Sequence, residues 1–199
     1  MPRARKSTEI RKREIIEAAR KLIYKKGSEH VTVNNIAKEV KISEAAIYRH
    51  FRNKKEILSF LASHITESLM QDIDTAVSSD LSYPDNIGGI LRSHLSKIEQ
   101  KRGVSFQVIA EIISFGDRKL NKQVYDSIQD YLKRFGGLLD NGIKAGVIRE
   151  DIDPEATALL LFGMIQGLVN TWALSNYSFD LTERYDALWK VFRRMVIRH

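Results

Sequence analysis

Residues 32–56, TVNNIAKEVKISEAAIYRHFRNKKE, constrain the fold more than any other stretch of the chain. Ile36 and Val40 are four residues apart, and so are Ile47 and Phe51. Each pair therefore marks one face of a short helix. The stretch predicts two short helices joined by a tight turn.

Capping residues precede each predicted helix. Thr32 and Ser43 can each accept a hydrogen bond from the first free amides of the helix that follows. Asn53 with Glu56 three residues later is a capping-box pattern that begins a third helix. Lys54 lies beside the free amides of that helix, which is a natural position for a phosphate. The whole stretch therefore predicts a helix-turn-helix.

The second short helix has an outer face suited to DNA. With Ile47 and Phe51 turned inward, a helical wheel places Ala45, Ala46 and Arg49 outside. Two small residues let the backbone come close to a surface, and an arginine can bond bidentately to a guanine edge while flanking polar groups bind phosphates. These features are typical of a recognition helix in a major groove. An ordinary exposed helix is the alternative interpretation.

The positive charge is concentrated in the segment that carries this motif. Residues 1–58 hold 16 Lys and Arg against 7 Asp and Glu, whereas residues 59–199 hold 16 against 18. This asymmetry favours a nucleic-acid partner, because neutralised phosphates release counterions. An anionic membrane would attract the same charge, but the first predicted helix lacks an aromatic-rich face. Residues 1–7 form a basic arm that either touches DNA or aids solubility.

The rest of the chain has a helical pattern of apolar residues and no alternating runs of strand length. Turn-forming residues at 80–86 are expected to end one helix. The sequence predicts an all-α fold of about nine helices, with a helix-turn-helix domain at 1–53 and a larger helical domain at 54–199. The expected longer helices are Glu9–Lys26, Lys54–Ser79, Ile87–Arg102, Val104–Phe115, Asp117–Gly146, Pro154–Ser175 and Thr182–Arg198.

The last two predicted helices carry much apolar surface, and Gly163 and Gly167 permit close helix packing. Such helices could form a self-complementary contact between two copies of the chain. Alternatively, the same stripe closes the core of one copy. The residues expected at the dimer interface are Leu161, Ile165, Leu168, Leu188, Phe192 and Met195.

The helix-turn-helix stretch resembles the DNA-binding signature of the TetR family of bacterial transcriptional regulators. The matching positions are Thr32, Ile36, Ala37, Ile42, Ser43, Tyr48, Phe51, Lys54 and Ile57. The resemblance implies phosphate contacts at Thr32, Tyr48, His50 and Lys54. It places Asn34, Glu44, Ala45, Ala46 and Arg49 at or near the bases, with Ser43 on the same surface. Lys41 stands where the family usually has Gly, so it must adopt a left-handed backbone or change the turn.

The resemblance also implies a homodimeric repressor that binds a palindromic double-stranded DNA operator and is released by a small hydrophobic effector. A chromosome-organising protein of the same fold is the alternative. The candidate effector-pocket residues, which plain core packing would explain equally, are Phe60, His64, Phe106, Ile109, Phe115, Tyr125 and Trp172.

The sequence shows no catalytic constellation, and its lack of cysteine excludes disulfides and thiol chemistry. His64 and His94 could meet in a metal or polar effector site, although structural histidines are the more common explanation of such positions. We therefore expect no enzyme activity, metal or cofactor. The basic amino end lacks the apolar stretch of a signal peptide, and the apolar run Ala158–Val169 is too short to span a bilayer. The protein is expected to be cytoplasmic, with no membrane partner.

Overall fold

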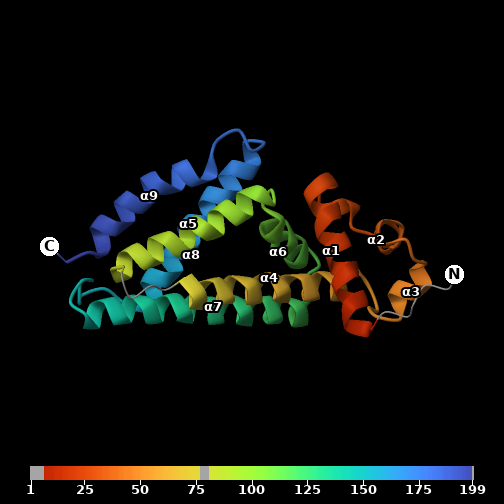
Figure 1. Cartoon of the computed structure of the whole chain (residues 1–199), viewed down its shortest axis with the longest axis horizontal. Coiled ribbons are helices and arrows are strands. Elements are labelled where there is room, and N and C mark those ends of the chain that lie inside the picture. Colours follow the sequence, from red (N-terminus) through yellow and green to blue (C-terminus); the bar gives the residue numbers. More distant parts are fainter. Residues whose placement is uncertain (1–6, 77–80, 199) are drawn as a thin grey trace. The chain divides into compact units, whose positions relative to one another are not determined.

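The computed structural model describes residues 7–76 and 81–198. Within these residues the chain forms nine α-helices, one 3-10 turn and no strand (Figure 1). The predicted all-α class is confirmed. The elements are α1 (Thr8–Lys26), η1 (Ser28–His30), α2 (Val33–Val40), α3 (Glu44–Tyr48), α4 (Lys54–Ala76), α5 (Tyr83–Gln100), α6 (Val104–Ser114), α7 (Arg118–Lys144), α8 (Pro154–Leu174) and α9 (Leu181–Val196).

The described residues divide into two compact units. The first unit comprises residues 7–65 and 107–124, and the second comprises residues 66–76, 81–106 and 125–198. α4, α6 and α7 each contribute to both units. The first unit therefore contains more of the chain than the helix-turn-helix domain expected at residues 1–53.

The core of the first unit is built under the helix-turn-helix. α1 packs against α2 and η1, and α2 packs against α3. Ile36 and Ile47 are 0 % exposed and Phe51 is 2 % exposed, as expected for the inward positions of α2 and α3. Burying each such side chain contributes about 1.5–3 kcal/mol. The apolar pattern that predicted the motif therefore also holds it together.

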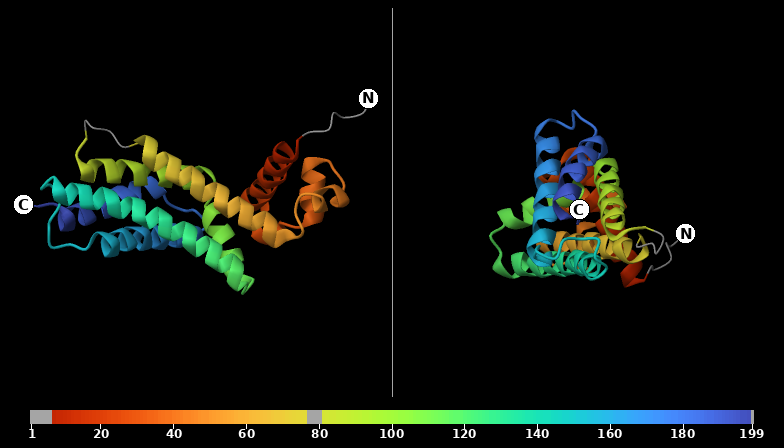
Figure 2. Two further views of the ribbon diagram at one scale, coloured as in Figure 1. Left: turned by 90° about the horizontal axis from the view of Figure 1, so that it is seen from below. Right: turned by 90° about the vertical axis from the view of Figure 1, so that its left-hand side faces the viewer.

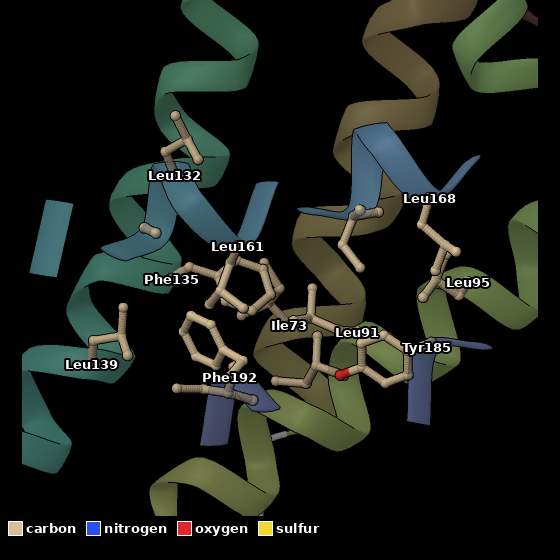
Figure 3. Close-up of a cluster of buried hydrophobic side chains, with 14 of the residues drawn as sticks. Ile73, Leu91, Leu95, Leu132, Phe135, Leu139, Leu161, Leu168, Tyr185 and Phe192 are labelled. Carbon is tan, nitrogen blue, oxygen red and sulfur yellow. The ribbon is translucent and has the colours of Figure 1, made fainter. Parts of the chain in front are cut away.

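The second unit has a larger core between its helices. In Figure 3 the labelled side chains of this cluster point toward one another from α4, α5, α7, α8 and α9. The Tyr185 hydroxyl donates to the carbonyl oxygen of Gly88 at 2.9 Å, and the indole N–H of Trp172 donates to that of Phe179 at 2.9 Å. Both buried aromatic rings thus keep a hydrogen-bond partner. The α4 segment of this unit and α7 run alongside each other (Figure 2), and Asp74 pairs with Arg134.

One predicted boundary is wrong. α5 begins at Tyr83, four residues before the expected start at Ile87, because Ser82 caps it by accepting from the amide of Asp85 at 3.3 Å. Pro84 lies in the first turn, where its missing N–H removes no helical hydrogen bond. Ala76 is the last described residue of α4, so its expected extension to Ser79 lies outside the described residues.

α8 has 21 residues and, among the described helices, is the one long and apolar enough to cross a membrane by length and composition. The predicted apolar run Ala158–Val169 is part of this longer helix, so the expectation that it is too short does not hold for α8 as a whole. A core helix of a folded domain meets the same test. One side of α8 is indeed buried in the second unit, through residues that include Ala158, Leu161 and Trp172.

Candidate nucleic-acid interface

The caps of the helix-turn-helix form as the sequence predicts. The Thr32 hydroxyl accepts from the amide of Asn35 at 3.1 Å, and the Ser43 hydroxyl accepts from the amide of Ala46 at 3.2 Å. Lys41 adopts a left-handed conformation with φ 59° and ψ 47°. Lys41 was expected either to adopt a left-handed backbone or to change the turn, and the first outcome is confirmed. A left-handed backbone at this residue costs about 1–2 kcal/mol relative to a right-handed one. The tight turn keeps its geometry without a glycine.

α3 is a short helix with one buried side. Ile47 is completely buried, whereas Ser43, Glu44, Ala45, Tyr48 and Arg49 are exposed; Ala46 and His50 are half-buried. Arg49 follows the last helical residue and has right-handed backbone angles, so it continues the surface of α3. On α2, Asn34 and the capping residue Thr32 are also exposed. These are the residues for which the resemblance implies DNA contacts.

His50 is expected to contact phosphate and is half-buried beside α3. Its Nδ1 has no hydrogen-bond partner within the part of the chain that the structure describes. Burial lowers the pKa of His50, and the nearby charges of Arg11, Lys12 and Arg49 lower it further. The protonated form of the imidazole is therefore disfavoured in the free protein. A phosphate placed against it would favour the protonated form.

Lys54, the other expected phosphate contact, is held inside the first unit. Its ammonium donates to Glu111 Oε1 at 2.7 Å and to the carbonyl oxygen of Ser28 at 3.3 Å. The second Glu111 oxygen accepts from the Ser28 hydroxyl at 3.1 Å. Glu111 lies in α6, so an acidic side chain from far along the sequence compensates the charge at the amino end of α4. Sequence reasoning missed Glu111, because no local signal connects the two segments.

The capping pattern at Asn53 is also present. The Asn53 side chain accepts from the amide of Glu56 at 3.0 Å. The Glu56 carboxylate accepts from the amide of Arg52 at 2.6 Å, one residue before the amide that a capping box uses. The amino end of α4 therefore already carries one carboxylate beside its free amides.

The candidate effector residues are divided between the two units. Phe60, His64, Ile109 and Phe115 belong to the first unit, and Phe106, Tyr125 and Trp172 belong to the second. Two of them have surroundings other than the lining of a pocket. Phe60 packs edge-on against Phe51 with ring centres 5.9 Å apart, and Tyr125 is 60 % exposed. In the second unit, Trp172 is part of the buried core and Phe106 packs against that core.

The two histidines considered for a metal or polar site also lie in different units. His64 is exposed in the first unit, whereas His94 is 2 % exposed in the second. His94 Nδ1 is 3.1 Å from the Tyr131 hydroxyl, and its Nε2 is 3.8 Å from Asp72 Oδ2. Burial lowers the pKa of His94 to about 4. The described residues contain no group of three or more side chains able to hold a metal ion.

Four of the six expected dimer residues are buried within the second unit. Leu161 and Phe192 point into its core (Figure 3), and Ile165 and Leu168 are 8 % exposed. Leu188 and Met195 are exposed by 36 % and 46 %. α8 and α9 also have other exposed apolar residues, which sequence reasoning did not select: Leu159, Leu160, Leu174 and Val191.

Comparisons with known proteins agree with this architecture. Residues 15–59 match the family described as bacterial regulatory proteins, tetR family. Residues 60–194 match the family described as YsiA-like protein, C-terminal region. The two matches together cover the helix-turn-helix and nearly all of the remaining chain.

Two relatives and one solved structure illustrate the range of similar proteins. The chain is 24 % identical over 168 residues to the fatty acid metabolism regulator protein of Bacillus subtilis (strain 168), covering 84 % of this chain and 86 % of the relative. It is 27 % identical over 191 residues to the nucleoid occlusion factor SlmA of Vibrio atlanticus (strain LGP32), covering 94 % and 95 %. The transcriptional regulator FadR from Bacillus subtilis, solved in complex with stearoyl-CoA, has a TM-score of 0.76 at 23 % identity, covering 90 % of this chain and 96 % of that chain. This last likeness shows the fold.

Proposed function

The chain belongs to the TetR family of bacterial DNA-binding regulators, and we propose that it is a homodimeric, non-enzymatic repressor that binds a palindromic operator in the cytoplasm. The observation that carries the proposal is the surface of α3. Ala45, Tyr48 and Arg49 are exposed while Ile47 anchors the helix in the core. A short helix with small residues and an outward arginine fits a major groove.

The distribution of charge along the chain also supports DNA binding by the unit that carries this surface. Residues 1–65 and 107–124, which make up the first unit, hold 19 Lys and Arg against 9 Asp and Glu, whereas the remaining residues hold 13 against 16. A positive excess confined to the unit that carries the helix-turn-helix attracts DNA to that unit.

We propose that the second copy covers the exposed apolar side of α8 and α9. Leu160 and Val191 are 55 % and 59 % exposed, and a Cβ added at Gly163 or Gly167 would meet no atom within 4 Å. Two glycines four residues apart leave room for close approach of another helix, and apolar side chains in this position are stabilised by burial. The buried positions Leu161, Ile165, Leu168 and Phe192 support the second unit instead, while Leu188 and Met195 stay in the proposed interface. Two operator half-sites would then be read by one assembly.

The proposed effector is a long-chain acyl compound. The carboxy-terminal family match covers residues 60–194, and similar proteins are a fatty acid metabolism regulator and a FadR solved with stearoyl-CoA. The large apolar core of the second unit suits an apolar chain better than a sugar. The candidate residues named from the sequence remain proposals for the pocket.

The likeness to the nucleoid occlusion factor SlmA favours a second candidate, a chromosome-organising role. Genome-wide binding distinguishes the two functions. A repressor occupies one or a few promoters, whereas an organiser occupies many dispersed sites. Release of DNA by stearoyl-CoA at micromolar concentration would favour the repressor.

Selection of bound sequences from a random DNA pool tests the proposal. We expect a palindromic motif, and an affinity that falls steeply with salt for both selected and random duplexes. Arg49→Ala is expected to relax the preference at one base position per half-site, whereas Lys54→Ala should weaken binding to all sequences alike. Arg20→Ala is a matched control, because Arg20 pairs with Glu17 on α1. Absence of any selected motif, with a flat salt dependence, would contradict the proposal.

A further inference from the structure

Glu44, the first residue of α3, is an acidic side chain on a basic surface, and its hydrogen-bond partner is a neutral side chain. It is exposed, and its Oε1 accepts a hydrogen bond from the side-chain amide of Asn34 at 2.6 Å. Asn34 lies near the start of α2, so this bond links the two helices of the motif. Within the part of the chain that the structure describes, no lysine or arginine forms an ion pair with Glu44.

Several other acids of the first unit form ion pairs with lysine or arginine, although Glu56 accepts, among the described residues, only from the backbone amide of Arg52. Glu14 pairs with Arg11, Glu17 with Arg20, and Glu39 with Lys21. The partner of Glu44 is instead a neutral amide, which fixes the direction of the carboxylate and leaves its charge in place. A flexible surface side chain that is held in this way loses less conformational freedom when it binds.

The position of Glu44 limits what the carboxylate can face. In a helix-turn-helix the first residues of the second helix lie against base edges, and phosphates flank them on both sides. A carboxylate that faces a phosphate is repelled. A carboxylate that faces a base amino group accepts a hydrogen bond.

The major groove offers two bases with an amino donor. Cytosine presents only its N4 amino group there, whereas adenine presents its N6 amino group beside the N7 acceptor. An ionised carboxylate with two acceptor oxygens is repelled by N7. It is likewise repelled by the acceptors of guanine and by O4 of thymine. Cytosine is therefore the base whose edge is complementary to Glu44.

We propose that Glu44, positioned by Asn34, selects cytosine at one position of each operator half-site by accepting a hydrogen bond from the cytosine N4 amino group. This inference rests on the proposed DNA-binding function and adds the base chemistry of its recognition. Glu44 determines specificity, and Asn34 is a positioning residue that acts through it. The uncompensated charge also lowers affinity for DNA that lacks the cytosine, because the carboxylate then faces acceptors or phosphates.

The test compares motifs selected from one random DNA pool by the wild-type chain and four variants. Wild type is expected to select cytosine at one position of each half-site. Glu44→Ala should lose the preference at that position alone, by about 10-fold, and bind random duplex DNA about 2- to 5-fold more tightly. Glu44→Gln should shift the selected base from cytosine to adenine, because a glutamine amide donates to N7 and accepts from N6.

Two further variants separate positioning from general charge effects. Asn34→Ala should reduce the cytosine preference by a smaller factor and leave the other positions unchanged. Glu39→Ala, which removes an acid of α2 that pairs with Lys21, should select the wild-type motif. Circular dichroism on every variant shows that the fold is kept, and Glu44→Gln retains the size of the side chain in case Glu44→Ala is unstable.

The outcomes distinguish this inference from the function on which it rests. If wild type selects a motif that Glu44→Ala and Glu44→Gln leave unchanged, the inference is wrong and the DNA-binding function stands. A selected base other than cytosine at the position that Glu44 controls would also overturn it. If wild type selects no motif, the proposed function fails, and the inference fails with it.

Discussion

Replacing Glu111 with glutamine tests whether an acid of the first unit, placed beside Lys54, weakens DNA binding. An ammonium group has three N–H donors, and Lys54 uses two of them on Glu111 and Ser28. One donor is left for a DNA phosphate. However, the Glu111 carboxylate already compensates the charge that this phosphate would meet. We therefore expect Glu111→Gln to bind DNA more tightly than wild type.

The size of this effect follows from the distances. A phosphate held by Lys54 would lie roughly 6 Å from the Glu111 carboxylate, where two like charges at an effective dielectric constant of about 40 repel by about 1.4 kcal/mol. Removing the negative charge should tighten binding by about 10-fold. Glutamine keeps an oxygen that can accept from Lys54 and a group that can bond the Ser28 hydroxyl, so the local packing is retained.

Fluorescence anisotropy with labelled duplexes measures the change for the selected operator and for a random sequence. Both affinities should rise alike, because a phosphate contact carries no sequence information. Because this repulsion acts directly between the Glu111 carboxylate and the phosphate, the same replacement in a Lys54→Ala background, where no ammonium pairs with Glu111, should tighten binding by at least as much. Glu17→Gln, which removes an exposed acid paired with Arg20, is the control. Equal or weaker binding by a Glu111→Gln protein with an unchanged melting temperature would refute the reasoning.

Three further predictions concern the second unit. Val191→Lys should convert the proposed dimer into a monomer in light-scattering measurements, and a retained dimer would contradict the proposed interface. Burial holds the pKa of His94 near 4, below its ordinary value of 6.5, so between these values the unfolded chain binds a proton that the folded chain does not. The free energy of unfolding, at its full value above pH 6.5, should therefore fall by about 2 kcal/mol between pH 7 and pH 5 in urea unfolding. His94→Gln should remove this contribution to the pH dependence of stability. Gly88→Ala should destabilise the fold by about 1–3 kcal/mol in the same assay, since its Cβ would lie 2.5 Å from the Trp189 ring. The neighbouring Gly89→Ala meets no atom within 4 Å and should not.

The caps of the helix-turn-helix could be predicted because they depend on residues within one turn. Thr32, Ser43 and Asp153 each sit directly before a helix and accept from an amide three residues later. The same capping rule, applied to Ser82, would have placed the start of α5 correctly. Ser82 caps α5 and Pro84 lies in its first turn, but the segment 80–86 was interpreted as a turn because so many of its residues favour turns.

The division of α8 between core and surface could not be predicted from the sequence. Both sides of the helix are apolar, so periodicity alone does not show which side faces the second unit. Leu161 and Leu160 are adjacent residues of the same type, yet one is 1 % exposed and the other 55 %. The packing of α8 against the other helices of the second unit decides between them, and this packing depends on residues far apart in the chain.

The electrostatics of the amino end of α4 likewise depend on distant residues. Lys54 pairs with Glu111 at 2.7 Å and Lys55 with Asp117 at 3.3 Å, and both ammonium groups lie within 6 Å of the centre of the Phe115 ring. Two consecutive lysines that look like free cations in the sequence are thus compensated by the segment 107–124.

Part of the positive charge that remains for DNA lies on the helix-turn-helix itself. Arg49, Arg52 and Lys38 are exposed and form no ion pair within the described residues. Exposed cations lose little solvation before they meet a phosphate, whereas a paired lysine must first leave its carboxylate. The salt dependence of binding should consequently be set more by the residues around α3 than by the lysines of α4. The same carboxylate that restrains Lys54 thereby increases the share of binding that depends on base recognition.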